Sequence, residues 1–421
     1  MSEAGFSHKI SGADKFQLLL DRHIRFTEPT GNIISLSIEV KGKIDAEELH
    51  KTVSTNTFLT QINSLEIEDG FLKIPRWKNG LVQTPVIITV SGETYDEPYI
   101  EEQGSTNLLN IDLVQGETNS VVSISVQHAV ADNRGIQAIA QIITGNIPAT
   151  GSLFAEEEKD TISFIQQLVH TLKATRLVFR KTPKKLAKLI ETNTDADINS
   201  VTKRYSILNF TSEETLKIEE NANHKGARLS KSAFYLAATS MALQQTIFAG
   251  NEGNTFFLPV PQNQRPRGND QVTLGNNLSF LFYTILFSKL NDLSESTAFI
   301  TEQMKQQIKE QSTKSYAYLL KTFRILPLAV YDLFFKMPTK GAVCSFLFSD
   351  VGETLAGMKT FMGKEIVEVL NFPPNPCPPH ITFVVMKHAG SLKVITAYNP
   401  KAVSRDEISK FEETLSALLK P

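Results

Sequence analysis

The stretch Val-Ser-Ile-Ser-Val-Gln-His-Ala-Val-Ala-Asp-Asn-Arg-Gly, residues 122–135, alternates apolar and polar side chains before it reaches a turn. Successive side chains of a strand point to opposite faces, so His128 continues the face that carries Val122, Ile124 and Val126. Gln127 points the other way. We therefore expect His128 at the edge of an apolar core, where burial favours the neutral imidazole that can accept a proton.

The residues after His128 admit two interpretations. Asp132 and Asn133 favour a turn, and Gly135 opens a predicted helix that runs to Thr144. In the first interpretation His128 is a general base and Asp132 supports the site. In the second, His128 is an ordinary core histidine and Asp132 only caps the helix. The HxxxD spacing alone does not decide between them.

Hydrophobic periodicity extends this pattern along the chain. It predicts strands at 33–40, 71–75, 85–90, 121–127, 204–210, 255–260, 278–287, 343–348, 380–387 and 391–398. It predicts further helices at 45–58, 161–190, 212–223, 230–248 and 404–419. Ser404 and Glu407 form a capping box for the last helix. Strands and helices alternate throughout, which is typical of a mixed α/β protein, or α+β.

A polar segment without periodicity, residues 191–202, predicts a linker between two halves. The N-terminal half is then 1–190, which carries the HxxxD motif, and the C-terminal half is 203–421. A chain of 421 residues exceeds the usual domain of ~100–200 residues, which agrees with this division.

Composition narrows the classes of function. The chain has 43 Lys and Arg against 45 Asp and Glu, a net charge of −2, so we expect no nucleic-acid partner. Two cysteines, Cys344 and Cys377, are too few for a disulfide framework. The N-terminus lacks an apolar signal core, and no apolar run reaches the ~18–20 residues of a membrane span. These features predict a cytoplasmic protein.

The sequence lacks the motifs of several kinds of catalytic and binding site. The sequence contains no zinc-type ligand spacing, no GxxxxGK[ST] or GxGxxG phosphate cradle, and no GxSxG elbow. We therefore expect no metal site, no nucleotide cofactor and no serine-hydrolase mechanism.

Residues 128–132 resemble the HHxxxDG motif of the carrier-dependent acyltransferase superfamily. This group includes condensation domains of nonribosomal peptide synthesis, polyketide-associated acyltransferases, and wax ester synthases with diacylglycerol acyltransferases. Further segments resemble the family in the same order. They are the opening strand and helix at 14–49, the "PVnlR" segment at 258–265, the "GN" turn at 274–277, the S-N-x-G turn at 349–352, and the Tyr-Asn-Pro segment at 398–400.

The resemblance implies two chloramphenicol-acetyltransferase-like halves with an active-site tunnel between them. It implies that His128 is the general base, that Asp132 is structural and pairs with Arg265, and that no covalent acyl-enzyme forms. The site lining that it implies consists of Gln127, Asn133, Gly135, Asn276 and Ser349. No bound cofactor is implied, because acyl-CoA or a phosphopantetheine-linked acyl group is a co-substrate.

Three positions depart from the family pattern. Gln127 replaces the first His, Asn133 stands where the family has Gly, and Asp350 replaces an Asn in the late turn. Asn tolerates positive φ better than most residues, so the turn at 133 can survive. The intact His128 and Asp132 favour an acyltransferase that acylates the hydroxyl, or less readily the amine, of a lipophilic acceptor. The three departures keep open a non-catalytic binding or recruitment module.

A basic stretch lies at 165–190. If the predicted helix continues, Arg176, Arg180, Lys184 and Lys188 form one stripe, because they are spaced four apart. Such a stripe is either a solvated face or a docking surface for the donor, as acyl carrier protein or acyl-CoA, or for an anionic membrane. A second apolar stretch, 316–337, is interrupted by Pro327. It predicts either a buried helix or a lipophilic substrate mouth.

Overall fold

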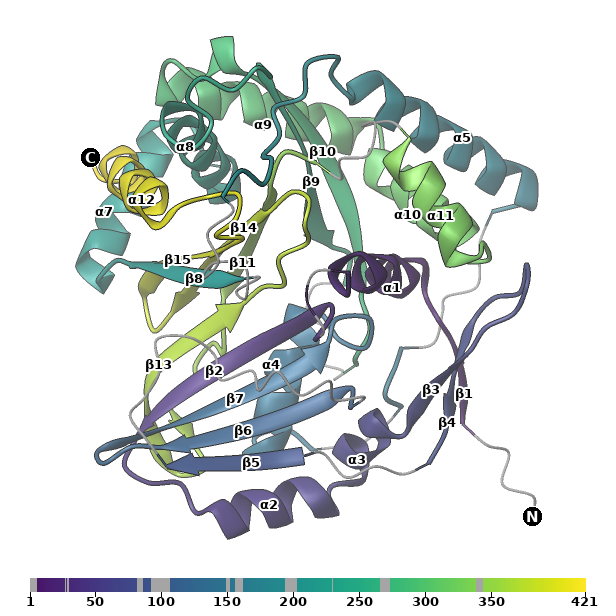
Figure 1. Ribbon diagram of the computed structural model, residues 1–421, viewed down its shortest axis with the longest axis vertical. Coiled ribbons are helices and arrows are strands. Elements are labelled where there is room, and N and C mark those ends of the chain that lie inside the picture. Colours follow the sequence, from purple (N-terminus) through teal and green to yellow (C-terminus); the bar gives the residue numbers. More distant parts are fainter. Residues whose placement is uncertain are drawn as a thin grey trace.

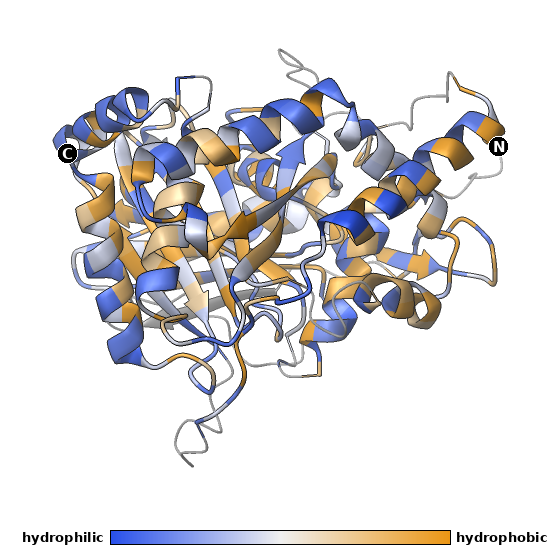
Figure 2. Cartoon of the chain, turned by 90° about the horizontal axis from the view of Figure 1, so that it is seen from above, coloured by the Kyte–Doolittle hydropathy of each residue, from blue (hydrophilic) through white to orange (hydrophobic). Residues whose placement is uncertain are grey.

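The computed structural model describes residues 6–26, 28, 30–81, 86–91, 107–148, 152–155, 162–193, 203–228, 230–265, 273–337 and 344–421. These residues form two mixed sheets that lie one above the other in Figure 1, with helices around them. The strands are predominantly hydrophobic, whereas the outer helices mix hydrophobic and hydrophilic residues (Figure 2). Burial of the strands between helix layers explains the contrast.

The lower sheet is built mainly from the N-terminal half. Its order is β12 (Thr360–Phe361), β13 (Lys364–Phe372), β2 (Ile33–Lys41), β7 (Asn119–Gln127), β6 (Leu109–Gln115) and β5 (Val86–Ser91). Only β5 and β6 pair in parallel. Its inner face carries the apolar residues predicted from the alternation, and Ile38 and Ile124 are fully buried. The associated helices are α2 (Ala46–Thr55), α3 (Thr57–Asn63) and α4 (Asn133–Ile143).

The upper sheet comes from the C-terminal half. Its order is β11 (Leu347–Glu353), β14 (Ile381–His388), β15 (Ser391–Tyr398) and β8 (Arg204–Asn209). Buried aromatic rings join this sheet to its helices, as in the contact of Phe383 with Phe411. Those helices are α7 (Ser212–His224), α8 (Lys231–Gln245) and α12 (Arg405–Leu419).

A long hairpin lies beside these sheets. It consists of β9 (Thr255–Asn263) and β10 (Leu278–Leu286), which pair antiparallel along their whole length. Its helices are α5 (Phe164–Lys181), α9 (Leu293–Lys309), α10 (Ser312–Phe323) and α11 (Leu328–Lys336). N-terminal α1 (Gly12–Ile24) packs on α10 and α11. A Cβ on Gly12 would lie 2.5 Å from the Leu320 backbone, so this close approach requires glycine. The remaining small sheet is β1 (Ser7–Lys9), β4 (Arg76–Asn79) and β3 (Leu65–Glu68).

Most predicted elements are confirmed within a few residues, including the capping box of Ser404 and Glu407. The predicted strand at 71–75 is wrong, because the chain turns there before β4. The helix predicted at 45–58 is interrupted at Asn56, whose side chain accepts from the backbone and caps α3. Residues 194–202 of the predicted linker lie outside the described residues.

The helix predicted at 161–190 is too long. Helix α5 ends at Lys181, and Thr182 already has an extended backbone. Pro183 explains the end, because the residue before a proline is driven out of the helical region. The chain then runs beside β9, where the Ala187 amide donates to the Thr255 carbonyl.

Candidate active site

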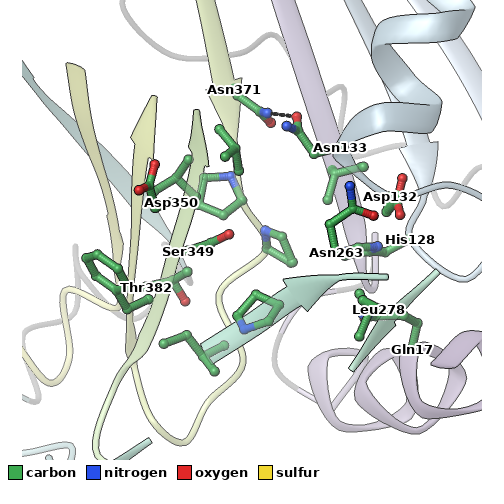
Figure 3. A pocket seen from close by; sticks show the side chains of 18 of the residues that line it. Gln17, His128, Asp132, Asn133, Asn263, Leu278, Ser349, Asp350, Asn371 and Thr382 are labelled. Atoms are coloured by element: carbon green, nitrogen blue, oxygen red, sulfur yellow. Dashed lines mark hydrogen bonds between the residues drawn. The ribbon is translucent and has the colours of Figure 1, made fainter. Parts of the chain in front are cut away.

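His128 lies directly after β7, at the point where the strand meets the turn before α4. Its backbone amide donates to the Asn32 carbonyl at 2.8 Å, which continues the pairing with β2 for one more residue. The Val130 amide then donates to the Gln127 carbonyl and closes the turn. The turn directs the His128 side chain into the wall of a cavity, which Figure 3 shows from close by.

The surroundings of His128 favour its neutral form. Burial lowers the pKa of His128, and the nearby Asp132 carboxylate only partly opposes this. Nδ1 lies 3.2 Å from the Ala131 carbonyl oxygen, which can only accept a hydrogen bond. The proton of the neutral ring is therefore assigned to Nδ1. Nε2 is left as the nitrogen that can take a proton from a substrate.

The two carboxylate oxygens of Asp132 make different contacts. Oδ1 accepts from the amides of Arg134 and Gly135, both at 3.1 Å, and so caps α4. Oδ2 accepts from Nη1 of Arg265 at 2.5 Å. Nη2 of the same guanidinium donates to the Gly275 carbonyl at 3.0 Å. Both proposed roles, cap and ion pair, are present, and Arg265 ties the segment after β9 to the His128 turn.

A third set of bonds secures the backbone of His128. The Asn276 amide group donates to the His128 carbonyl at 2.6 Å and to the Asp14 carboxylate at 3.0 Å. Asp14 also accepts from the Asn276 backbone at 2.7 Å. Burial raises the pKa of Asp14, while these donors oppose that shift. Sequence reasoning did not find the role of Asp14, although its capping box with Ser11 marks the start of α1.

The cavity has a volume of about 400 Å³ and is lined by both halves of the chain. His128, Asp132, Asn133 and Arg134 lie on one side, and β11 residues Ser349 and Asp350 lie across from them (Figure 3). The amide group of Asn371 on β13 donates to Asn133 Oδ1. Apolar walls complete the cavity, with Phe16, Leu20, Ile34, Phe280, Val384 and several prolines. The lining thus combines apolar walls with several polar side chains, as is typical of binding sites for organic molecules.

Solved structures share this architecture. The trichothecene 15-O-acetyltransferase from Fusarium sporotrichioides superposes with a TM-score of 0.72 at 10% identity, over 98% of this chain and 95% of that chain. The first condensation domain of the calcium-dependent antibiotic synthetase gives a TM-score of 0.68 at 12% identity, over 98% of this chain and 95% of that chain. The chain has the acyltransferase and condensation-domain fold.

The same fold occurs in the epimerization domain from the third module of tyrocidine synthetase B, with a TM-score of 0.62, 14% identity, and coverage of 99% of this chain and 96% of that chain. No sequence family and no curated protein matches this sequence. The resemblance inferred from the HxxxD motif is thereby confirmed at the level of the fold, including its two-lobed form.

Within this acyltransferase and condensation-domain fold, the residues expected in the lining divide into two groups. Asn133 and Ser349 lie in the cavity wall. Gln127, Gly135 and Asn276 lie behind it, so their placement in the lining was wrong. Gln127 turns away and donates to Asp21 at 2.8 Å, Gly135 packs against Ala131, and Asn276 holds the backbone.

Asp350 is the departure whose position is most informative. It lines the cavity, and its Oδ1 accepts from the Gly352 amide at 3.2 Å. Burial raises the pKa of Asp350, while the Gly352 donor and the Lys387 charge oppose this. The wall opposite His128 therefore carries a carboxyl group that lines the cavity.

The basic stripe does not exist as one helical face. Arg176 and Arg180 are exposed on α5, but Lys184 and Lys188 follow the end of the helix at Pro183. The α5 face that carries the two arginines continues instead into exposed apolar side chains, at Ile165, Val169 and Leu172. Among the described helices, none is both long and apolar enough to cross a membrane.

Proposed function

We propose that this protein transfers an acyl group from a thioester donor to a hydroxyl group of a lipophilic acceptor, with His128 as the general base. The observation that carries the proposal is the assigned His128 tautomer at the cavity wall. Nδ1 is satisfied by Ala131, burial favours the neutral ring, and Nε2 is available to a substrate. General base catalysis of this kind contributes ~10²–10⁴-fold.

The reaction needs no other protein group to change its bonds. Nε2 of His128 takes the hydroxyl proton while the acceptor oxygen forms a bond to the thioester carbonyl carbon. The tetrahedral intermediate then collapses, and the carbon–sulfur bond breaks. The proton passes from Nε2 to the sulfur of the leaving thiol, so that His128 is neutral again. No covalent acyl-enzyme is required.

The substrate classes follow from the cavity and from the similar structures. The largely apolar walls of the cavity favour a lipophilic acceptor. An oxygen acceptor is supported by the name of the similar acetyltransferase, which describes O-acetylation. The donor is acyl-CoA or an acyl group on a carrier protein, and the similarity to condensation domains of synthetases supports the second source.

A non-catalytic recruitment module is the alternative for this fold. Such a module would have no use for an open cavity beside an oriented histidine. The cavity of about 400 Å³ reaches His128, which favours an enzyme. Asn133 and Asp350, which depart from the family pattern, line this cavity and do not close it.

We place the enzyme in the cytoplasm, in peripheral contact with an anionic lipid surface. The α5 face supports this, since exposed Ile165, Val169 and Leu172 precede Arg176 and Arg180 on one side of the helix. Apolar side chains followed by arginines suit the boundary between acyl chains and anionic headgroups.

The test is a donor and acceptor panel. Purified protein is incubated with acyl-CoA and acyl carrier protein donors of several chain lengths, together with primary and secondary alcohols and amines, and products are identified by mass spectrometry. An ester that wild type forms and His128→Ala does not form is the expected result. Products from wild type and His128→Ala at equal rates would refute the proposal.

A further inference from the structure

A second pocket of about 100 Å³ lies beside the catalytic cavity, between α5, α10, α11 and the β9–β10 hairpin. Its walls are aromatic and aliphatic. They include Val178, Phe257, Phe282, Leu319, Phe323 and Phe335. Thr175 and Tyr331 bring the only hydroxyl groups, and Thr175 Oγ1 donates to the Thr171 carbonyl at 2.9 Å within its own helix. Such walls offer water few partners, so the pocket favours hydrocarbon over water.

The pocket adjoins the catalytic cavity and shares wall residues with it. Phe16 of α1, Pro259 of β9 and Phe280 of β10 line both spaces. A chain of methylene groups that passes these three residues leaves the cavity that contains His128 and enters apolar surroundings only. The reactive end of a substrate can therefore lie beside His128 while its tail occupies the second pocket.

The outer end of the pocket reaches the surface. Phe179 on α5 and Phe334 on α11 line this end of the pocket. Phe179 is nevertheless 47% exposed to solvent, and Phe334 is 46% exposed. A packing defect in a core would be enclosed by buried residues, since interiors are packed with few voids. Two exposed aromatic rings at the edge instead mark an opening between α5 and α11.

We infer that this second pocket, lined by α5, α10, α11 and the β9–β10 hairpin, is a subsite for a straight hydrocarbon chain of the substrate. The inference deepens the proposed acyl transfer and rests on it for the identity of the substrate. The chain belongs either to the acyl donor or to the lipophilic acceptor. The chemistry recognised by the pocket is the same in both cases.

The experiment measures binding, so it does not depend on turnover. Two probe series are titrated by calorimetry into the full chain: straight-chain alcohols from butanol to dodecanol, and S-alkyl-coenzyme A thioethers of the same chain lengths, which cannot transfer an acyl group. Each methylene that enters the pocket should tighten binding by about fourfold. Affinity should stop rising once the pocket is full. The series that shows this dependence identifies the source of the chain.

The test variant is Val178→Phe, which fills the pocket from α5. Its matched control is Val367→Phe, the same change at an exposed position on β13 outside the pocket. Val178→Phe should stop the rise at a shorter chain, whereas Val367→Phe should follow wild type. Leu319→Trp on α10 is a second filling variant, and thermal unfolding identifies any variant that fails to fold.

His128→Ala separates this inference from the proposed function. That variant should keep the chain-length dependence even though it loses turnover. If it keeps the dependence and wild type forms no ester, the proposed function fails and the subsite stands. Affinity that does not change with chain length in either series overturns the subsite. Identical profiles for Val178→Phe and Val367→Phe overturn it as well.

Discussion

The two sides of the catalytic cavity are built in opposite ways. On the His128 side, the histidine and its backbone donate to the Asn32 and Ala131 carbonyls and accept from the Asn276 side chain. On the side formed by α1 and the β9–β10 hairpin, Phe16 and Phe280 present apolar surface without directional bonds. Orientation is thus fixed where a proton must move, and apolar shape contributes to substrate selection on the side formed by α1 and the hairpin.

Removal of the base should have the largest effect. His128→Ala should lower kcat by roughly 10²-fold or more, because the Asp132 carboxylate on the same side is already engaged by Arg265 and by the cap of α4. Turnover is measured with the best donor and acceptor of the panel. The exposed His224→Ala on α7 is the matched control and should keep wild-type turnover. Near-normal kcat for His128→Ala would show that His128 does not take the proton of the acceptor.

Substitution of Asp132 should destabilise the His128 side of the cavity. Asp132→Ala removes the cap of α4 and leaves the Arg265 guanidinium unpaired, which should cost about 3 kcal/mol in the free energy of unfolding. Urea unfolding measures the loss. Asp132→Asn should lose less, because the amide oxygen still caps the helix.

The pairing itself is tested by a double variant. Asp132→Ala with Arg265→Leu removes both charges and should recover part of the stability lost by Asp132→Ala alone. Additive losses for the two substitutions would mean that the 2.5 Å contact contributes no coupling.

Asn276→Ala should have a smaller effect. It removes the side-chain donor shared by the His128 carbonyl and Asp14, at a cost of about 1–3 kcal/mol. Because the turn that holds His128 loosens, kcat should fall more than the donor KM rises. Asn291→Ala, an exposed amide in the C-terminal half, serves as the control for both measurements. Unchanged stability would show that Asn276 does not secure the turn.

The pH dependence should report the burial of His128. A protonated His128 cannot accept the hydroxyl proton, so activity is lost as the pH falls through its pKa. Since burial lowers that pKa, the acidic limb of kcat should lie below the ordinary histidine value near 6.5. A profile of kcat against pH with a non-titrating acceptor measures it. A limb at or above the ordinary value would contradict the buried, neutral histidine.

Charge reversal on the outer surface should have the smallest effect. Arg176→Glu with Arg180→Glu should weaken binding to anionic liposomes by about 1 kcal/mol per residue at low salt. Lys184→Glu with Lys188→Glu lies beyond the helix end and should have less effect. Turnover at saturating donor should not change, and salt should reduce the difference. Equal liposome binding by wild type and both variants would make these residues a solvated surface.

The sequence was sufficient for what depends on local pattern. Alternation predicted β2 and β7 and placed His128 at the strand end, and the motif resemblance predicted the pairing of Asp132 with Arg265. Contacts between distant segments have no local signal, so Asp14 under Asn276 and the Asn133–Asn371 bond were not predicted. Pro183 is a local signal for the end of α5, but the prediction of a helix at 161–190 followed the long hydrophobic periodicity instead.

Strand β13 has a consequence for how the molecule is made. It joins the lower sheet at the edge of β2, although the two strands come from near opposite ends of the chain. During synthesis β2 leaves the ribosome early, and its outer edge has no partner until β13 follows. An unpaired edge is a template for association with other chains. Slow translation or truncation before residue 364 should therefore promote aggregation, and a peptide that supplies residues 364–372 in trans should suppress it.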